Sequence, residues 1–171
     1  LRELAPDAPL RAGGFDAALL EGATLVVASP GVSLQEPIFV RARALGLEVV
    51  GDIALFARAT RGVPTVGITG TNGKSTVTTL VGRMAARAGR KVRVGGNLGP
   101  PALELLEEPG EAELYVLELS SFQLEATGTL QLVAGAVLNV TADHLDRHAD
   151  MAAYAAAKAR IFARCGTAVV N

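Results

Sequence analysis

A short glycine loop between an apolar strand and a helix constrains this chain more than any other stretch. Val66–Thr69 is typical of a buried strand, and it leads into the loop Gly70-Thr71-Asn72-Gly73-Lys74-Ser75-Thr76. A strand, a tight turn and a helix N-terminus direct several backbone N–H groups at one point, which is how many proteins bind phosphate. The loop therefore predicts a nucleoside triphosphate site, with Lys74 at the outer phosphates and Ser75 or Thr76 at a magnesium ion.

The spacing of this loop departs from the common P-loop. That pattern has a glycine six residues before the lysine, and this chain has Ile68 at that position. The alternative is an ordinary strand–turn–helix corner, because Asn-Gly is a common turn pair. Lys-Ser-Thr directly at a helix start is rare by chance, so the loop favours the phosphate site.

The order of apolar runs predicts an α/β fold with parallel strands. Strands are expected at residues 24–28, 47–50, 65–69, 91–95, 114–119 and 135–140. Helices are expected at residues 36–45, 52–59 with Asp52 as the cap, 76–88, 101–107 and 152–163. A polar segment with Gly62 and Pro64 predicts a domain boundary. The chain is thus predicted to hold the end of a Rossmann-like doubly wound domain (residues 1–62) and the first part of a P-loop ATPase α/β domain (residues 63–171).

Composition argues against several classes of protein. A formal net charge of -1 over 171 residues, with both signs scattered, argues against nucleic acid or an anionic membrane as the main partner. No apolar run reaches the roughly 18 residues of a membrane span, and no secretory leader is visible. The single cysteine, Cys165, excludes a disulfide framework and fits the reducing cytoplasm. The final residues, 169–171, read as an unfinished strand, so we expect a segment of a longer protein.

Two strand ends carry polar residues where ligands of open α/β sheets bind. Glu118 lies in the apolar run 115–119, where an unpaired carboxylate is costly. An acidic residue there, next to a P-loop strand, usually binds magnesium; the alternative is a strand end that reaches solvent. Ser29-Pro30-Gly31 follows an earlier strand, and taken alone it is more often a plain turn than a site.

A polar cluster follows the run at residues 135–140. The segment 141–148 holds two histidines, two aspartates and an arginine within a few residues. His144 is a candidate ligand of a second metal ion or a contact to a substrate anion. The alternative is a satisfied surface or core histidine, and the residues alone leave the two open.

Lys158 is the third candidate. Tyr154, Lys158 and Ile161 are spaced by three or four residues and share one otherwise apolar helix face. The chain has only three lysines against thirteen arginines, so a lysine here invites a role for its amine. A buried amine has a lowered pKa and can react with carbon dioxide to give a carbamate, an anion that binds magnesium. The residues alone favour a lysine that extends its amine to solvent.

These segments together resemble the Mur ligases of peptidoglycan synthesis, an ATP-dependent family that includes folylpolyglutamate synthase. The family's loop is G-T-N-G-K-[ST], as in Gly70–Ser75. Glu118–Glu125 (ELSSFQLE) is similar to the members of the family that add D-glutamate. Three further segments match the same members in order and approximate spacing: Gly95–Gly99, Asp143–His148 and Tyr154–Ile161. The resemblance covers nearly the whole chain.

The resemblance implies a role for each matching residue. Residues 70–76 would hold the ATP phosphates. Two magnesium ions would be bound, the first by Ser75 and Glu118 and the second by His144 and a carbamylated Lys158. Catalysis would then depend on Lys74, Glu118, His144 and Lys158. The muramoyl-alanine end of the substrate would be contacted by Asn97, Ser120, Gln123 and His144. The UDP end would be contacted, in the N-terminal domain, by Ser29, Pro30 and Gly31.

The implied reaction is the ATP-dependent addition of D-glutamate to UDP-N-acetylmuramoyl-L-alanine through an acyl phosphate. The resemblance further implies a cytoplasmic enzyme of cell wall synthesis that acts as a monomer. The family's third domain is absent from these residues, so this segment alone is expected to be inactive. Two alternatives stay open: another Mur-type or folylpolyglutamate-type ligase, and a P-loop nucleotide-binding protein without ligase activity.

Overall fold

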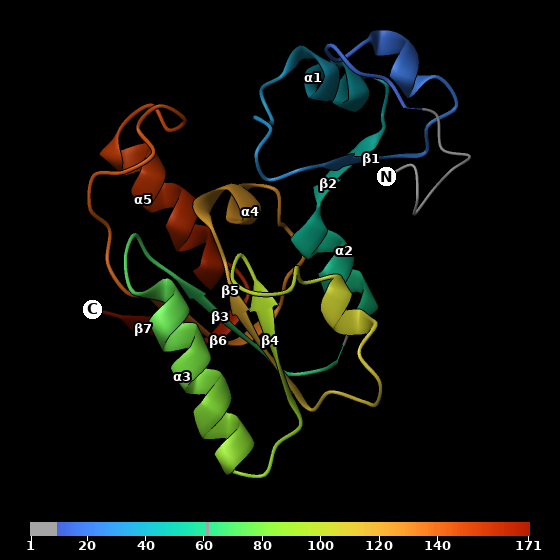
Figure 1. The fold of residues 1–171 in the computed structure, drawn as a ribbon. Helices are drawn as coiled ribbons and strands as arrows, with labels where there is room; N and C mark the ends of the chain where they lie inside the picture. Colours follow the sequence, from blue (N-terminus) through green and yellow to red (C-terminus); the bar gives the residue numbers. More distant parts are fainter. Residues whose placement is uncertain (1–9, 61) are drawn as a thin grey trace.

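The computed structural model describes residues 10–60 and 62–171, and it contains two parallel sheets (Figure 1). Residues 1–9 and 61, which belong to the predicted N-terminal domain, lie outside this description. The smaller sheet pairs β1 (Leu25–Ala28) with β2 (Glu48–Gly51). Its helical segments are η1 (Ala17–Leu20), α1 (Pro37–Ala44) and α2 (Asp52–Ala59).

The larger sheet has five parallel strands in the order β4-β5-β3-β6-β7. These are β3 (Thr65–Thr69), β4 (Val92–Gly96), β5 (Leu114–Glu118), β6 (Leu132–Val137) and β7 (Cys165–Val170). Its helical segments are α3 (Lys74–Arg87), η2 (Glu104–Leu106), α4 (Ser121–Glu125), α5 (Met151–Ala159) and η3 (Arg160–Phe162). Because β3 is central, with β5 on one side and β6 on the other, its carboxyl end is the topological switch point where ligands of such sheets bind.

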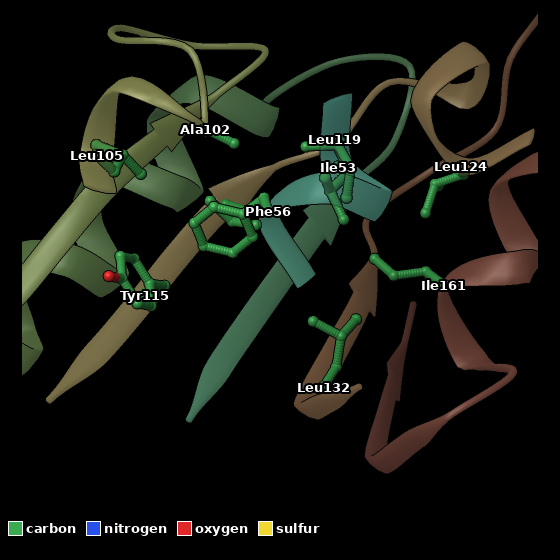
Figure 2. Close-up of a cluster of buried hydrophobic side chains, with 10 residues drawn as sticks. Ile53, Phe56, Ala102, Leu105, Tyr115, Leu119, Leu124, Leu132 and Ile161 are labelled. Atoms are coloured by element: carbon green, nitrogen blue, oxygen red, sulfur yellow. The ribbon is translucent and has the colours of Figure 1, made fainter. Parts of the chain in front are cut away.

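One hydrophobic core joins the two parts of the chain (Figure 2). Ile53 and Phe56 of α2 are fully buried, although α2 directly follows the smaller sheet. Phe56 meets Tyr115 of β5 edge to face, with ring centroids 4.9 Å apart. A separate, smaller core beneath α1 contains Leu20, Ala28, Ile38, Phe39 and Ala42. Helix α2 therefore helps to cover the larger sheet, and this packing fixes the two parts against each other.

The predicted α/β class with parallel strands is confirmed, and most predicted elements lie within two residues of the observed ones. The strand predicted at residues 135–140 is wrong in extent, because β6 runs from Leu132 to Val137. One further backbone bond to β3 follows, in which Leu138 N donates to Thr69 O at 2.9 Å, and the strand does not extend past it. The helix predicted at residues 101–107 is only the 3-10 turn η2. The boundary predicted at residue 62 falls between α2 and β3 and stays a prediction.

The predicted cap of α2 is also wrong. Gly51 is the N-cap residue, and Asp52 occupies the first helical position. The Asp52 carboxylate accepts a hydrogen bond from Gln123 Nε2 of α4 at 3.0 Å. Its charge still lies at a helix N-terminus, where it is favoured, but its hydrogen bond joins α2 to α4. Of the helices in the part of the chain that the structure describes, none has the length and apolarity to cross a membrane.

Candidate active site

The loop after β3 ends in a helix N-terminus that has free backbone donors. Gly73 precedes α3 with φ +81°, a left-handed conformation that glycine adopts without a side-chain clash. At Gly70 a Cβ would lie 3.1 Å from the Leu138 Cβ and 3.4 Å from Asn139 N, so the loop packs closely on the segment after β6. The first N–H groups of α3 have no partner within the helix, as at any helix start, and such groups can bind an anion.

Asn139 holds this loop in shape. Its Oδ1 accepts hydrogen bonds from Thr71 N at 3.1 Å and Asn72 N at 2.9 Å, and its Nδ2 donates to Asn72 O at 3.0 Å. The sequence prediction missed this residue, because it placed Asn139 inside a strand. A polar side chain next to the end of an apolar run was the available signal.

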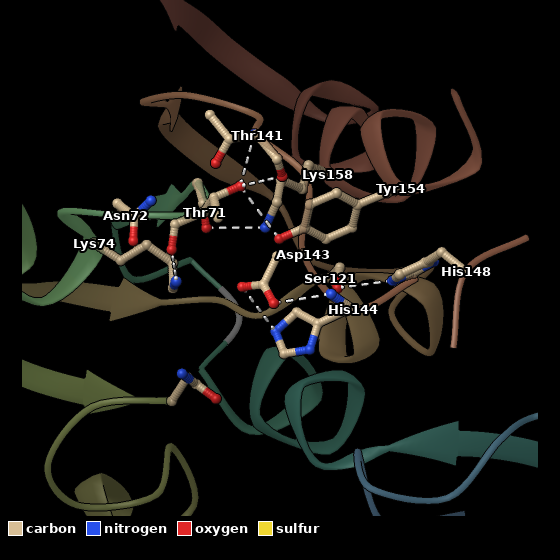
Figure 3. Close-up of polar contacts among 12 residues, drawn as sticks. Thr71, Asn72, Lys74, Ser121, Thr141, Asp143, His144, His148, Tyr154 and Lys158 are labelled. Atoms are coloured by element: carbon tan, nitrogen blue, oxygen red, sulfur yellow. Dashed lines mark hydrogen bonds and ion pairs between the residues drawn. The ribbon is translucent and has the colours of Figure 1, made fainter. Parts of the chain in front are cut away.

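Thr71 links the loop to the polar segment 141–148. The Thr71 hydroxyl accepts from Thr141 N at 3.0 Å and donates to Thr141 O at 3.3 Å. The same oxygen lies 3.4 Å from the Tyr154 hydroxyl of α5 (Figure 3). Lys74 Nζ donates to Thr71 O at 2.8 Å, so the amine of the predicted phosphate-binding lysine lies over the loop. The loop, the segment after β6 and α5 are thus joined by one hydrogen-bond network.

Glu118 is the buried acid of the site. It ends β5, is only 2% exposed, and both of its carboxylate oxygens are bonded. Oε2 accepts from Ser75 Oγ at 2.7 Å, and Oε1 accepts from Asn97 Nδ2 at 2.8 Å. A Cβ on Gly96 would lie 2.4 Å from Glu118 O, so glycine allows β4 to approach β5 closely here. Three predicted site residues from three segments therefore meet at one carboxylate.

The donor set fits magnesium. Carboxylate and hydroxyl oxygens are ligands that Mg²⁺ takes together with nucleotide phosphates, and here both lie beside the predicted phosphate-binding loop. Ser75 and Glu118 would supply one hydroxyl and one carboxylate oxygen to the ion, and the Ser75 hydroxyl hydrogen would then turn away from Glu118. The geometry at the end of β5 is thus compatible with the predicted first magnesium ion.

Lys158 is buried, which overturns the reading that its amine extends to solvent. The residue is 2% exposed, and Nζ donates to Gly70 O, just after β3, at 2.9 Å. Nζ also lies 4.4 Å from the centroid of the Tyr154 ring, a cation–π contact. The pKa of Lys158 is lowered from 10.5 to about 8, first because burial disfavours the charged form, then because the Lys74 ammonium repels it, while Asp143 acts in the opposite direction. The amine is therefore easier to deprotonate than an ordinary lysine.

His144 lies on the outer side of this network. Its ring is half exposed, and its Nε2 lies 3.6 Å from Asp143 Oδ2. The residue has φ +52°, which is uncommon for a residue with a side chain, and its ring meets Phe122 at 5.2 Å. Within residues 10–60 and 62–171, no three His, Cys, Asp or Glu side chains form a preformed metal cluster. The role of His144 at a second metal ion stays a prediction.

Ser120 and Gln123 form the capping box of α4. Gln123 N donates to Ser120 Oγ at 3.2 Å, and Ser120 N donates to Gln123 Oε1 at 3.1 Å. The Gln123 amide also donates to Asp52, so both side chains already have partners inside the protein. Their predicted contact with the substrate is not tested by these bonds. Both residues do, however, fix α4 at the end of β5.

His148 is a second residue that the sequence prediction did not single out. It is 4% exposed, its Nε2 lies 3.0 Å from Ser121 Oγ, and its Nδ1 lies 3.5 Å from Glu125 Oε1. Its ring is stacked on Phe122 with centroids 5.5 Å apart. His148 thus anchors the segment 141–148 on α4. Its spacing of four from His144 was the available signal, but that spacing does not say which histidine is buried.

The Ser29–Gly31 loop follows β1 in the smaller sheet. Val32 N donates to Ser29 O at 2.9 Å, which closes a turn, and Gly31 O accepts from Arg147 Nη1 at 2.8 Å. The loop is therefore tied to the segment that carries His144. Its predicted contact with the UDP end of a substrate is untested.

Family models match both parts of the chain. The Mur ligase middle domain matches residues 68–171, and the MurD-like N-terminal domain of Mur ligases matches residues 1–51. Curated relatives named UDP-N-acetylmuramoylalanine–D-glutamate ligase include one from Nitrosococcus oceani, 60% identical over 171 residues, and one from Escherichia coli K12, 55% identical over 160 residues. These matches cover 100% and 93% of this chain, but only 37% and 36% of the two relatives.

Solved structures share the fold. A UDP-N-acetylmuramate:L-alanyl-gamma-D-glutamyl-meso-diaminopimelate ligase from Neisseria meningitides superposes with a TM-score of 0.59 at 19% identity, over 94% of this chain and 56% of that one. A UDP-N-acetylmuramoyl-L-alanyl-D-glutamate–2,6-diaminopimelate ligase gives a TM-score of 0.57 at 22% identity, over 86% of this chain and 40% of that one. At these identities the likeness concerns the fold alone.

Burial of Lys158 predicts a specific pH dependence of stability. Between the folded pKa of about 8 and the ordinary value of 10.5, the unfolded chain holds a proton that the folded chain has lost. Stability from this group is therefore reduced below about pH 8, and it recovers as the pH rises toward 10.5, by up to about 3 kcal/mol. Urea unfolding in carbon-dioxide-free buffer should show wild type gaining stability relative to Lys158→Met over this range. Parallel pH profiles for the two proteins would contradict the lowered pKa.

Proposed function

The chain belongs to the Mur ligase family, and from that premise we propose that the protein of which it is part joins D-glutamate to UDP-N-acetylmuramoyl-L-alanine at the expense of ATP. The observation that carries the proposal is 60% identity, along the whole chain, to a relative named for that reaction. The chain spans a little over a third of that relative (37%), so the activity is proposed for the intact protein. Segments beyond these residues would complete the site, and residues 1–171 alone would not turn over.

The ATP phosphates would lie over the loop after β3. Residues 70–76 would hold the phosphates through the remaining backbone N–H groups of the loop and the first turn of α3, because Thr71 N and Asn72 N are already bonded to Asn139. The Lys74 amine would leave Thr71 O, now 2.8 Å away, for the outer phosphates. Thr76 lies in the first turn of α3, where its N–H has no helical partner. Asn139 would hold the loop in its present shape in the absence of nucleotide, because its side chain accepts hydrogen bonds from Thr71 N and Asn72 N.

Two magnesium ions would neutralise the anions that must approach one another. Ser75 and Glu118 would hold the first, and His144 with Lys158 as a carbamate would hold the second. Support for the first is the 2.7 Å contact between the Ser75 hydroxyl and Glu118. Support for the carbamate is a buried amine whose lowered pKa, about 8, leaves about a tenth of it neutral at pH 7, far more than for an ordinary lysine. Bound magnesium would supply charge stabilisation for phosphoryl transfer.

The proposed reaction has two steps. An oxygen of the alanine carboxylate attacks the γ-phosphorus of ATP, the bond to the β-phosphate oxygen breaks, and ADP leaves with those electrons. The amine of D-glutamate then attacks the acyl phosphate carbonyl, loses a proton, and expels inorganic phosphate. This chain's part is to align the carboxylate with the phosphate and to supply Lys74 against the repulsion between two anions.

The nucleotide-sugar substrate would span both parts of the chain. Its UDP end would contact Ser29, Pro30 and Gly31 beside the smaller sheet. Its muramoyl-alanine end would contact Asn97, Ser120, Gln123 and His144 near the end of β5. These residues follow the carboxyl ends of strands, where ligands of α/β sheets bind. We further propose a UDP-binding domain over residues 1–62, an ATP-binding domain from residue 63, and a cytoplasmic monomer without nucleic acid or membrane partners.

Phosphate release separates this proposal from its alternatives. The intact protein should release phosphate from ATP only when UDP-N-acetylmuramoyl-L-alanine and D-glutamate are both present, and the product should carry one added glutamate by mass spectrometry. Replacing D-glutamate with L-alanine or a diamino acid should reduce the rate at least about a hundredfold, because a stereochemical or charge mismatch raises the activation free energy by about 3 kcal/mol or more. Equal rates with another amino acid would favour a different Mur-type ligase, and release without the sugar substrate would favour a plain nucleotide hydrolase.

Carbamylation is tested by ¹³C NMR of the intact protein in ¹³C-bicarbonate. A carbonyl signal attached to a lysine amine should appear in wild type and be absent from Lys158→Arg, because an arginine is not deprotonated in proteins. The matched control is Lys91→Arg, an exposed lysine, which should leave the signal unchanged. Survival of the signal in Lys158→Arg would rule out this residue as the carbamate.

A further inference from the structure

Among the described residues, three long-range hydrogen bonds join the part of the chain that holds the smaller sheet to the part that holds the larger one. Two lie near the start of α2: the Asp52 carboxylate with Gln123, and Gly51 N with Ala126 O at 3.4 Å. At Gly51 a Cβ would lie 2.8 Å from the Ala126 Cβ, so this part of the junction is tightly packed. The third contact is made by Arg147, which reaches the loop after β1. Arg147 belongs to the segment 141–148 that also carries His144, so this contact comes from a different segment than the two at α2.

The Arg147 guanidinium makes two contacts, one to each part of the chain. Nη1 donates to Gly31 O at 2.8 Å, a hydrogen bond from a charged donor to a backbone carbonyl. The guanidinium carbon lies 4.6 Å from the centroid of the Phe122 ring on α4. The plane of the guanidinium therefore rests on α4 while one nitrogen extends to the other sheet. A lysine amine cannot make both contacts with the same geometry.

The base of Arg147 is fixed as well. Arg147 N and His148 N both donate to His144 O at 3.0 Å, so the three residues form one turn. His148 anchors that turn through Ser121 at 3.0 Å and by stacking on Phe122. His144 and Arg147 thus belong to one hydrogen-bonded turn. The position of the Ser29–Gly31 loop is thereby linked to the position of the His144 ring.

We propose that Arg147 is a positioning residue that sets the distance between the two ends of the nucleotide-sugar site. This inference rests on the proposed function, in which Gly31 belongs to the UDP end and His144 to the muramoyl-alanine end. The Arg147 guanidinium then fixes the Ser29–Gly31 loop, which would bind UDP, relative to the turn at His144, which would meet the acceptor carboxylate. Arg147 would not touch the reacting atoms. Its charged guanidinium, bonded to Gly31 O, would keep the two parts of the chain in the arrangement that this long substrate needs.

The consequence is a selective loss. Without Arg147, the loop after β1 and the His144 turn are no longer fixed relative to each other, so a ligand that contacts both sites must order them when it binds. ATP, which would bind the loop after β3, does not span the two sheets and is spared. The packing of Ile53 and Phe56 keeps the fold intact, because it does not involve Arg147.

The test is calorimetric binding and steady-state kinetics of the intact protein with Arg147→Ala, Arg147→Lys and the control Arg87→Ala, an exposed residue at the end of α3. For Arg147→Ala the Kd and KM for UDP-N-acetylmuramoyl-L-alanine should rise about tenfold, as expected for loss of one charge-assisted hydrogen bond. The Kd for ATP should stay within twofold and Tm within a few degrees. Arg147→Lys should recover only part of the loss, and Arg87→Ala should match wild type.

Two results overturn the inference in different ways. If wild type binds the nucleotide sugar and Arg147→Ala binds it equally well, or loses ATP binding in the same proportion, the positioning role is wrong while the proposed function stands. If wild type does not bind the nucleotide sugar at all, the proposed function fails and the inference fails with it. A rise in Kd for the nucleotide sugar alone supports both.

Discussion

The buried carboxylate of Glu118 is the interaction on which the site depends. A charge with 2% exposure at a strand end is costly unless it is bonded, and here a serine of α3 and an asparagine after β4 each donate to one oxygen. These bonds fix the start of α3 and the end of β4 relative to β5. Because β5 lies next to β3, the same carboxylate sets where the glycine loop opens. The loop and the acid are thus one unit rather than two neighbouring motifs.

A second network completes that unit from the other side of β3. Asn139 shapes the loop, Thr71 ties it to Thr141, and the Lys158 amine bonds to Gly70 O. The segment that follows carries His144 and is anchored on α4 through His148. Helix α4 in turn contacts α2 through Gln123 and Asp52. The short helix α4 therefore connects the smaller sheet to the glycine loop, to Glu118 and to Lys158. Its capping box keeps it at the end of β5.

Much of this arrangement follows from the sequence, for identifiable physical reasons. Parallel strands place their carboxyl ends on one edge, so Lys74, Asn97, Glu118 and the segment after β6 were expected to lie together. Helical spacing correctly put Tyr154, Lys158 and Ile161 on one buried face. The sequence-based predictions were wrong at positions where a distant side chain supplies the hydrogen bond. Asn139 was hidden by a strand predicted three residues too late, and Asp52 looked like a cap because its true partner, Gln123, lies 71 positions away. The depth at which Lys158 is buried depends on neighbouring strands, which periodicity does not describe.

The central claim is that the Glu118 carboxylate binds the magnesium ion that accompanies ATP at the loop after β3. Titration calorimetry of ATP with and without Mg²⁺ measures this directly in wild type, in Glu118→Gln, and in Glu111→Gln, an exposed control. The account predicts that Mg²⁺ tightens ATP binding in wild type and in Glu111→Gln, and that Glu118→Gln loses most of that gain, about tenfold or more, because an amide oxygen carries no charge for the cation. Equal magnesium dependence in Glu118→Gln and wild type would contradict it.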